Sequence, residues 1–198
     1  WAEQVRQRRY AIDDAEVKPY FPLERMVAAA FDCAERLFGV RFVNRQGLKL
    51  YHPDVNAYEV RGPGDKLVGV FLHDNFARPS KRSGAWMSHY RQQTKNGGAV
   101  TPIVVNNNNF AKSAPGQPTL LSFDDVRTLF HEFGHAIHYL NYDITWPGLG
   151  NTPRDFVEYP SQVNENWLLT PYILNTYAKH AETGEPIPQA LVEKIKAS

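Results

Sequence analysis

The amino-acid sequence predicts a mainly α-helical protein that also carries a small, mostly antiparallel β-sheet. Apolar residues recur at helical spacing near both ends of the chain and over residues 122–140. Between these segments lie short strand-like runs, which are separated by turn signals such as RGPGD and KNGG. Within one domain spanning 1–198, we therefore expect helices over 1–39, a small β-sheet region over 40–110 and further helices over 111–198.

The composition is that of a soluble globular protein, with 42% hydrophobic and 22% charged residues. The net charge of +1 gives no reason to expect a nucleic-acid or membrane surface. No apolar run approaches the ~20 residues that span a bilayer. Cys33 is the single cysteine and cannot form an internal disulfide, so we expect a reducing compartment, the cytoplasm. The chain lacks an initiator Met and closes on a helical pattern, so we expect both ends to lie inside a longer protein.

Residues 22–39, PLERMVAAAFDCAERLFG, have the features of a complete helix. Pro22 suits the first turn and Gly39 suits the C-terminal cap. The apolar residues that share one face are Met26, Ala30, Cys33 and Leu37. Residues 1–10 look like the tail of a further, charged helix.

The middle of the chain changes to the pattern of short strands. The strand candidates are RFVN (41–44), NAYEV (56–60), KLVGVFLHD (66–74), GAWMS (84–88) and TPIVVN (101–106).

A central helix begins at Ser122, which together with Asp125 resembles a capping box. Its apolar positions are Phe123, Val126, Phe130, Phe133, Ile137 and Leu140. A second helix is predicted to follow the loop, with Thr152 as its cap, Pro153 in its first position and Asp155 at the box position. Pro160 should kink that helix or restart it. The spacing in PQALVEKIK predicts one last helix over 188–196.

The central helix carries His131-Glu132-Phe133-Gly134-His135. Residues four apart share a helix face, so the two histidines can offer two imidazole nitrogens to one zinc ion. Glu132 is turned about 100° from His131, and it can reach a water bound to that ion as a general base. Gly134 costs about 1 kcal/mol in a helix interior, which indicates the close approach of a strand, ligand or second helix. The alternative is a solvated helix with two unconnected histidines.

A catalytic zinc normally has three protein ligands, and the third is expected from another element. Glu158, among apolar neighbours in RDFVEYPSQVNENW, is the candidate. Glu165 is too far along to bind the same ion and suits a role in orienting a ligand histidine. Asp125 could do the same or could stabilise the helix dipole. His138 lies about 10 Å along the helix from His131, so it is either a partly buried helix residue or a substrate contact.

FHEFGHAIH followed by PRDFVEYPSQVNENW resembles the thimet-oligopeptidase family of zinc peptidases. Other segments also resemble this family, namely DDAEVKPYF, HPDV, FARPSKRSGAW and APGQPTLLSFDDV. EVKPYFPLE and VNENW look most like its peptidyl-dipeptidase branch, the dipeptidyl carboxypeptidases. The resemblance covers essentially all 198 residues.

The resemblance implies a zincin-like catalytic core within a larger, mostly helical, two-lobed peptidase that acts on short peptides as a monomer. It implies one Zn²⁺ per chain, bound by His131, His135 and Glu158, with Glu132 as the base. The site residues that it implies for the substrate backbone are Gly84, Ala85 and Trp86.

Two departures from the family pattern bear on activity. The loop between His138 and Arg154 is shorter than is usual in the family. The family's HxxxGYDAGYYSY segment, whose tyrosine stabilises the tetrahedral intermediate, has no match in these 198 residues. The expected function is zinc-dependent release of C-terminal dipeptides from short peptides. The alternatives are an oligopeptide endopeptidase of the same family and a non-catalytic zinc-binding fragment.

Overall fold

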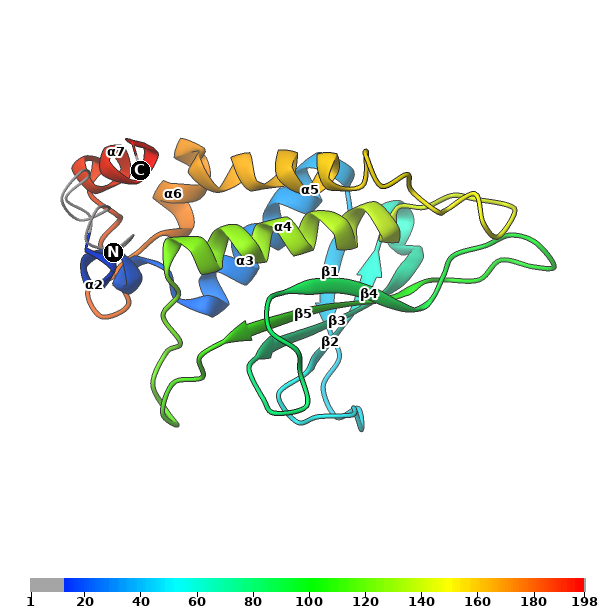
Figure 1. Ribbon diagram of the computed structural model, residues 1–198, viewed down its shortest axis with the longest axis horizontal. Helices are drawn as coiled ribbons and strands as arrows, with labels where there is room; N and C mark the ends of the chain where they lie inside the picture. The colour runs from blue at the N-terminus through cyan, green and yellow to red at the C-terminus, as the bar shows by residue number, and fades with distance from the viewer. Residues whose placement is uncertain (1–12, 198) are drawn as a thin grey trace.

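The computed structural model describes residues 13–197, in which helices cover one side of a five-stranded sheet (Figure 1). The predicted helix over residues 1–10 lies outside the described range. The helices, 3-10 helices included, are α2 Asp14–Val17, η1 Lys18–Tyr20, α3 Leu23–Phe38, η2 Pro63–Asp65, α4 Phe123–Leu140, α5 Glu158–Glu165, η3 Asn166–Leu169, α6 Pro171–Tyr177 and α7 Gln189–Ala197. The strands are β1 Arg41–Asn44, β2 Asn56–Arg61, β3 Leu67–Phe76, β4 Trp86–Arg91 and β5 Ile103–Phe110.

The sheet is mixed, which corrects the prediction of a mostly antiparallel one. Its strand order is β1-β2-β3-β5-β4, and the central pair β3–β5 is parallel while the other pairs are antiparallel. After β3 the chain passes to the edge of the sheet and forms β4. It then returns through residues 92–102 to insert β5 between β3 and β4. Strand patterns reveal where strands form, but this insertion of β5 depends on tertiary pairing.

An aromatic cluster joins the inner face of the sheet to the helices. Phe31 of α3 stacks on Phe42 of β1 with ring centroids 4.2 Å apart. Phe133 of α4 lies 5.6 Å from Phe71 of β3, edge to face. These rings come from all three segments that the sequence distinguishes, and they belong to one hydrophobic core. A smaller cluster that includes Leu72 lies on the outer face.

Helix α3 forms where predicted, although Pro22 is its N-cap and does not lie in its first turn. Gly39 ends it in the left-handed conformation, with φ of 67°, which a glycine adopts without strain. The shared apolar face is buried at Met26 and Cys33, but Leu37 is 43% exposed. The buried stripe therefore stops before the last turn of α3.

Helix α4 begins at the predicted capping box. The Ser122 side chain accepts the Asp125 N–H at 3.1 Å, and the Asp125 carboxylate accepts the Ser122 N–H at 3.0 Å.

The second helix starts later than predicted. Residues 154–157 form turns, and α5 begins at Glu158, so Thr152 is not its cap. Pro160 then falls in the first turn, where a backbone N–H has no helical partner to lose. Because no helix leads directly into Glu158, Pro160 neither kinks nor restarts one. Helix α6 was not predicted, although Pro171 in its first position is a helix-start signal.

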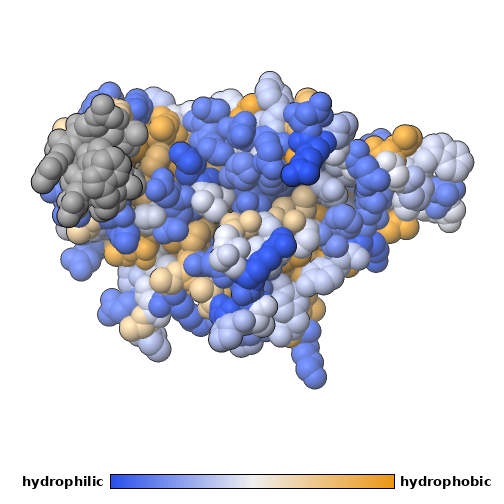
Figure 2. All heavy atoms as spheres, viewed as in Figure 1, coloured by the Kyte–Doolittle hydropathy of each residue, from blue (hydrophilic) through white to orange (hydrophobic). Residues whose placement is uncertain are grey.

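Two loops project together beyond the sheet, residues 92–102 and 141–152, and they lie side by side in Figure 1. The Gln93 side chain binds both backbone groups of Ile144, accepting its N–H at 2.8 Å and donating to its carbonyl at 3.2 Å. Figure 2 shows small orange patches among pale and blue surface at this end of the molecule, where Trp146 and Leu149 are exposed. None of the helices between residues 13 and 197 is long and apolar enough to cross a membrane.

Candidate metal centre

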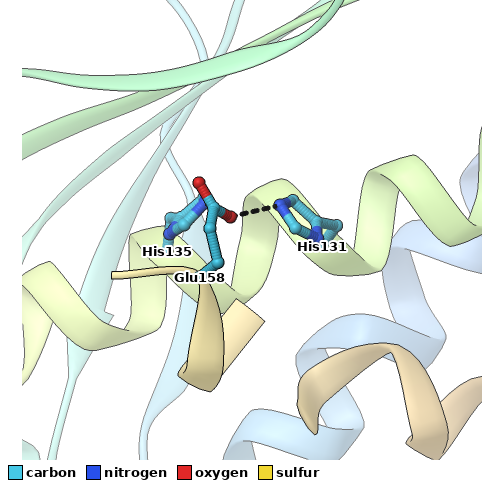
Figure 3. Close-up of side chains that lie close together, drawn as sticks. All are labelled: His131, His135 and Glu158. Carbon is cyan, nitrogen blue, oxygen red and sulfur yellow. Dashed lines mark hydrogen bonds and ion pairs between the residues drawn. The ribbon is translucent and has the colours of Figure 1, made fainter. Parts of the chain in front are cut away.

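Two helices bring three potential metal ligands together (Figure 3). His131 and His135 lie one turn apart on α4, and their ring centroids are 5.0 Å from each other. Glu158, the first residue of α5, places Oε2 3.0 Å from Nε2 of His131 and 3.2 Å from Nε2 of His135. One ligand atom from each residue lies within 4.8 Å of the others. The separation of 27 positions along the chain between His131 and Glu158 is thus closed by helix packing.

Gly134 permits the close packing of α4 against α5. A Cβ at this position would lie 2.7 Å from the Ser161 Cα and 2.9 Å from the Asn164 Cβ. The sequence predicted a close neighbour for this glycine, and the structure shows that it is the second helix. The Asn164 amide also donates to the carbonyl of Phe130 at 2.7 Å, which ties the buried face of α5 to the backbone of α4.

Glu165 contacts the far side of the His131 ring from Glu158. Nδ1 of His131 is 2.6 Å from Oε1 of Glu165. A carboxylate at this distance favours the proton on Nδ1, which leaves the Nε2 lone pair for a metal. This is the position that the predicted orienting role requires, and the role itself stays a prediction.

Glu132 lies beside the three ligands and is only 8% exposed. Burial raises the pKa of its carboxyl group above the ordinary value, and the Glu158 carboxylate adds to that. His131 and a hydrogen bond to the Met87 backbone act in the opposite direction without cancelling the rise. The Glu132 side chain therefore lies beside the Met87 backbone of strand β4. A buried carboxyl group with a raised pKa is suited to accept and release a proton.

The donor set fits a zinc ion. Burial lowers the pKa of His135, so its imidazole is neutral and available as a ligand at neutral pH. Two imidazoles and one carboxylate form a ligand set found in catalytic zinc sites, in which a fourth position stays open. The side chain of Glu158 is 53% exposed whereas that of His135 is 11% exposed, so the cluster opens to solvent on the Glu158 side.

The predicted substrate-backbone residues lie at and just before the start of β4. Ala85 lines a pocket that also includes His131 and Glu132. Trp86 begins β4, and the Arg82 guanidinium lies 4.6 Å above its ring. Gly84 precedes the strand with φ of 80°.

The structure separates two of the candidates from the centre. Asp125 forms the capping box with Ser122. Within residues 13–197 it makes no hydrogen bond to either ligand histidine. His138 lines a different pocket, beside Phe38 and Pro160, and its ring meets Tyr142 edge-on at 5.2 Å. A role for His138 as a substrate contact stays a prediction.

Two contacts at the centre were missed from the sequence. The Met87 backbone contact to Glu132 depends on the sheet edge meeting α4, which no local pattern reveals. Arg127, whose Nε is 3.5 Å from Glu165 Oε2, lies four residues before His131. Its helical spacing was a signal that could have identified it.

Comparison with known proteins identifies relatives of the whole chain. A model of Peptidase family M3 matches residues 1–198. The chain is 44% identical to a dipeptidyl carboxypeptidase of Salmonella typhimurium over 200 residues, which cover 99% of this chain and 29% of that protein. It is 36% identical to oligopeptidase A of Escherichia coli, over 100% of this chain and 30% of that protein. A thimet-like oligopeptidase of Dictyostelium discoideum is 34% identical over 96% of this chain and 29% of its own length.

Proposed function

The chain belongs to peptidase family M3, and on that premise we propose that it forms the zinc-binding catalytic core of a peptidase that releases C-terminal dipeptides from short peptides. It spans about 29% of the dipeptidyl carboxypeptidase that it matches, so the proposal concerns the part that these residues play in a longer enzyme. The observation that carries the proposal is the cluster of His131, His135 and Glu158 with the buried Glu132 beside it. The larger, two-lobed architecture is part of the same proposal.

His131, His135 and Glu158 would hold one zinc ion per chain. When bound, the ion supplies Lewis-acid chemistry, which polarises a carbonyl and lowers the pKa of water. The contact of Glu165 with Nδ1 of His131 orients that ring and supports this assignment. Asp125 acts on the site indirectly, since its capping box fixes the start of α4.

Glu132 is the general base in this proposal. Its carboxylate takes a proton from the attacking water and later passes it to the leaving amine. The carboxylate lies beside the Met87 backbone of β4, and burial keeps its pKa above the ordinary value. The position beside β4 keeps the carboxylate near the attacking water. The raised pKa lets it accept a proton and release it again.

The peptide would bind along β4, at the residues that resemble the family's substrate strand. Strand β4 is at the end of the sheet order, so one side of it has no strand partner within the described residues. An extended peptide can add to such an edge through backbone hydrogen bonds. Gly84, Ala85 and Trp86 lead into this strand, and Ala85 lines the pocket that reaches Glu132.

Zinc content is the first test of this proposal. Elemental analysis of the purified chain should give about one zinc per chain, and the His135→Ala variant should lose it. Absence of zinc from the wild-type chain, even after incubation with the metal, would show that these residues do not form the site by themselves.

Glu132→Gln tests the base separately from the metal. The amide keeps the shape of the side chain but cannot accept the proton, so zinc should stay bound while peptide hydrolysis is lost. Peptide turnover at the wild-type rate would remove Glu132 from the reaction.

An oligopeptide endopeptidase is the second candidate, favoured by the identity to oligopeptidase A. The product ladder from one long peptide separates the two, because only the first candidate releases successive C-terminal dipeptides. A non-catalytic zinc-binding fragment would bind the metal and produce no ladder. A cytoplasmic location and a monomeric full-length enzyme belong to the proposal as well.

A further inference from the structure

A pocket of about 360 Å³ lies beside the proposed metal centre, between α4, α5 and the start of β4. Its walls include His131 and Glu132, and beyond them Ala85, Arg127, Thr128 and Glu165. The pocket therefore continues from the reacting groups toward the N-terminal end of α4. A peptide bound at the metal centre would send one end into it.

Arg127 is the only residue lining this pocket, among those described, that carries a permanent positive charge. Its Nε lies 3.5 Å from Oε2 of Glu165, and its side chain is 59% exposed. Glu165 is held more tightly elsewhere, through its 2.6 Å contact with His131. Within residues 13–197, Arg127 forms no other ion pair, so the two terminal nitrogens of the guanidinium are available to an anion.

Three pairs of neighbouring residues indicate that β4 runs in the same direction as α4. Ala85 and Thr128 line one pocket, the Met87 backbone lies beside Glu132, and His89 stacks on Tyr139 with ring centroids 5.2 Å apart. A peptide that pairs antiparallel with β4, the more stable arrangement per residue, runs opposite to both. Its C-terminus then points toward the N-terminal end of α4 and Arg127.

The distance along α4 matches two peptide residues. Arg127 precedes His131 by four positions, which is a rise of about 6 Å along the helix. Two extended residues span about 7 Å. The carboxylate of a peptide that ends two residues beyond the cleaved bond therefore falls at the level of the guanidinium.

We propose that Arg127 binds the C-terminal carboxylate of the substrate and so selects peptides with two residues after the cleaved bond. A guanidinium matches a carboxylate with two parallel hydrogen bonds, which gives orientation as well as attraction. This inference rests on the proposed peptidase function and makes it specific. In this inference, the position of Arg127 is the reason why dipeptides are released.

The test compares a peptide acid with its amide on variants of the chain. N-acetyl-tetraalanine and its C-terminal amide are titrated calorimetrically into zinc-loaded Glu132→Gln protein, which does not consume the peptide. The acid should bind about tenfold more tightly than the amide, equivalent to ~1.4 kcal/mol. Arg127→Gln should abolish this preference. Arg127→Lys keeps the positive charge but lacks the paired N–H donors of the guanidinium, so it should retain part of the preference.

Arg41→Gln is the matched control, because Arg41 is also a half-exposed arginine in an ion pair, but on β1 at the opposite edge of the sheet. It should leave the preference for the acid unchanged. Equal binding of acid and amide, no binding of either peptide, or a preference that survives Arg127→Gln would overturn the inference.

Hydrolysis assays on chains with an intact Glu132 separate a failure of the Arg127 inference from a failure of the proposed peptidase function. Cleavage of acid and amide at equal rates leaves the peptidase and removes the role of Arg127. Binding that depends on Arg127 without cleavage would retain the carboxylate site and reject the peptidase.

Discussion

Replacing Gly134 with alanine tests whether helix packing sets the geometry of the metal centre. The added methyl group would lie 2.7 Å from the Ser161 Cα, whereas ordinary contacts begin at 3.4 Å. Helix α5 must therefore retreat by about 0.7 Å, and Glu158 at its start moves with it. Metal–ligand distances tolerate only about 0.2 Å of error. We expect zinc affinity to fall by about 10- to 100-fold, the range seen when supporting contacts of a metal ligand are lost.

The effect on stability should be smaller than the effect on zinc. Alanine gains about 1 kcal/mol of helix propensity over glycine. Overpacking costs about 1–3 kcal/mol, so the two contributions partly cancel in the metal-free protein. Urea unfolding without metal should therefore show a loss of about 2 kcal/mol or less. Competition with a chromophoric chelator measures the zinc affinity of the same samples.

Gly62→Ala is the matched control for the added methyl group. Gly62 lies in the connection between β2 and β3, and its Cβ would meet the Val68 Cγ2 of β3 at 2.9 Å, away from the metal centre. That variant should keep the zinc affinity of the wild type. A Gly134→Ala protein with zinc affinity within twofold of wild type would refute the reasoning, because it would show that α5 can absorb the clash without moving Glu158.

Two further predictions concern a supporting contact and the sheet. Glu165→Gln should weaken zinc binding about tenfold in the same chelator assay, since a neutral amide orients the partner imidazole less firmly than a carboxylate; unchanged affinity would leave Glu165 outside the site. Burial raises the pKa of Asp74, but hydrogen bonds from Arg78 and Lys81 outweigh it and hold the pKa at about 2. This pKa is below the ordinary 3.8, so the contribution of about 2 kcal/mol is complete above pH 4 and is lost as pH falls toward 2. Urea unfolding of wild type and Asp74→Asn between these pH values should show a loss that is larger in wild type by about 2 kcal/mol.

Local signals in the sequence were sufficient where a short segment decides the structure. The box of Ser122 and Asp125 starts α4, and Gly39 ends α3, because capping involves groups a few residues apart. All five strands overlap the segments that alternation and turn residues predicted, although β4 and β5 each begin two residues later and end further along the chain than predicted. The predicted start of α5 was wrong because a good cap at Thr152 does not compel a helix: residues 154–157 form local turns instead.

The sequence by itself determined the chemistry that this chain can offer, since His131 and His135 share a helix face by spacing alone and Glu132 follows directly. It also predicted that Gly134 has a close neighbour. Only the tertiary structure decided which segments meet there: that Glu158 reaches the histidines, that β4 is an edge strand against Glu132, and that β5 inserts between β3 and β4. The reason is physical. Helical and strand periodicities are properties of neighbours along the chain, whereas these contacts join segments tens of residues apart and depend on how side chains pack between them.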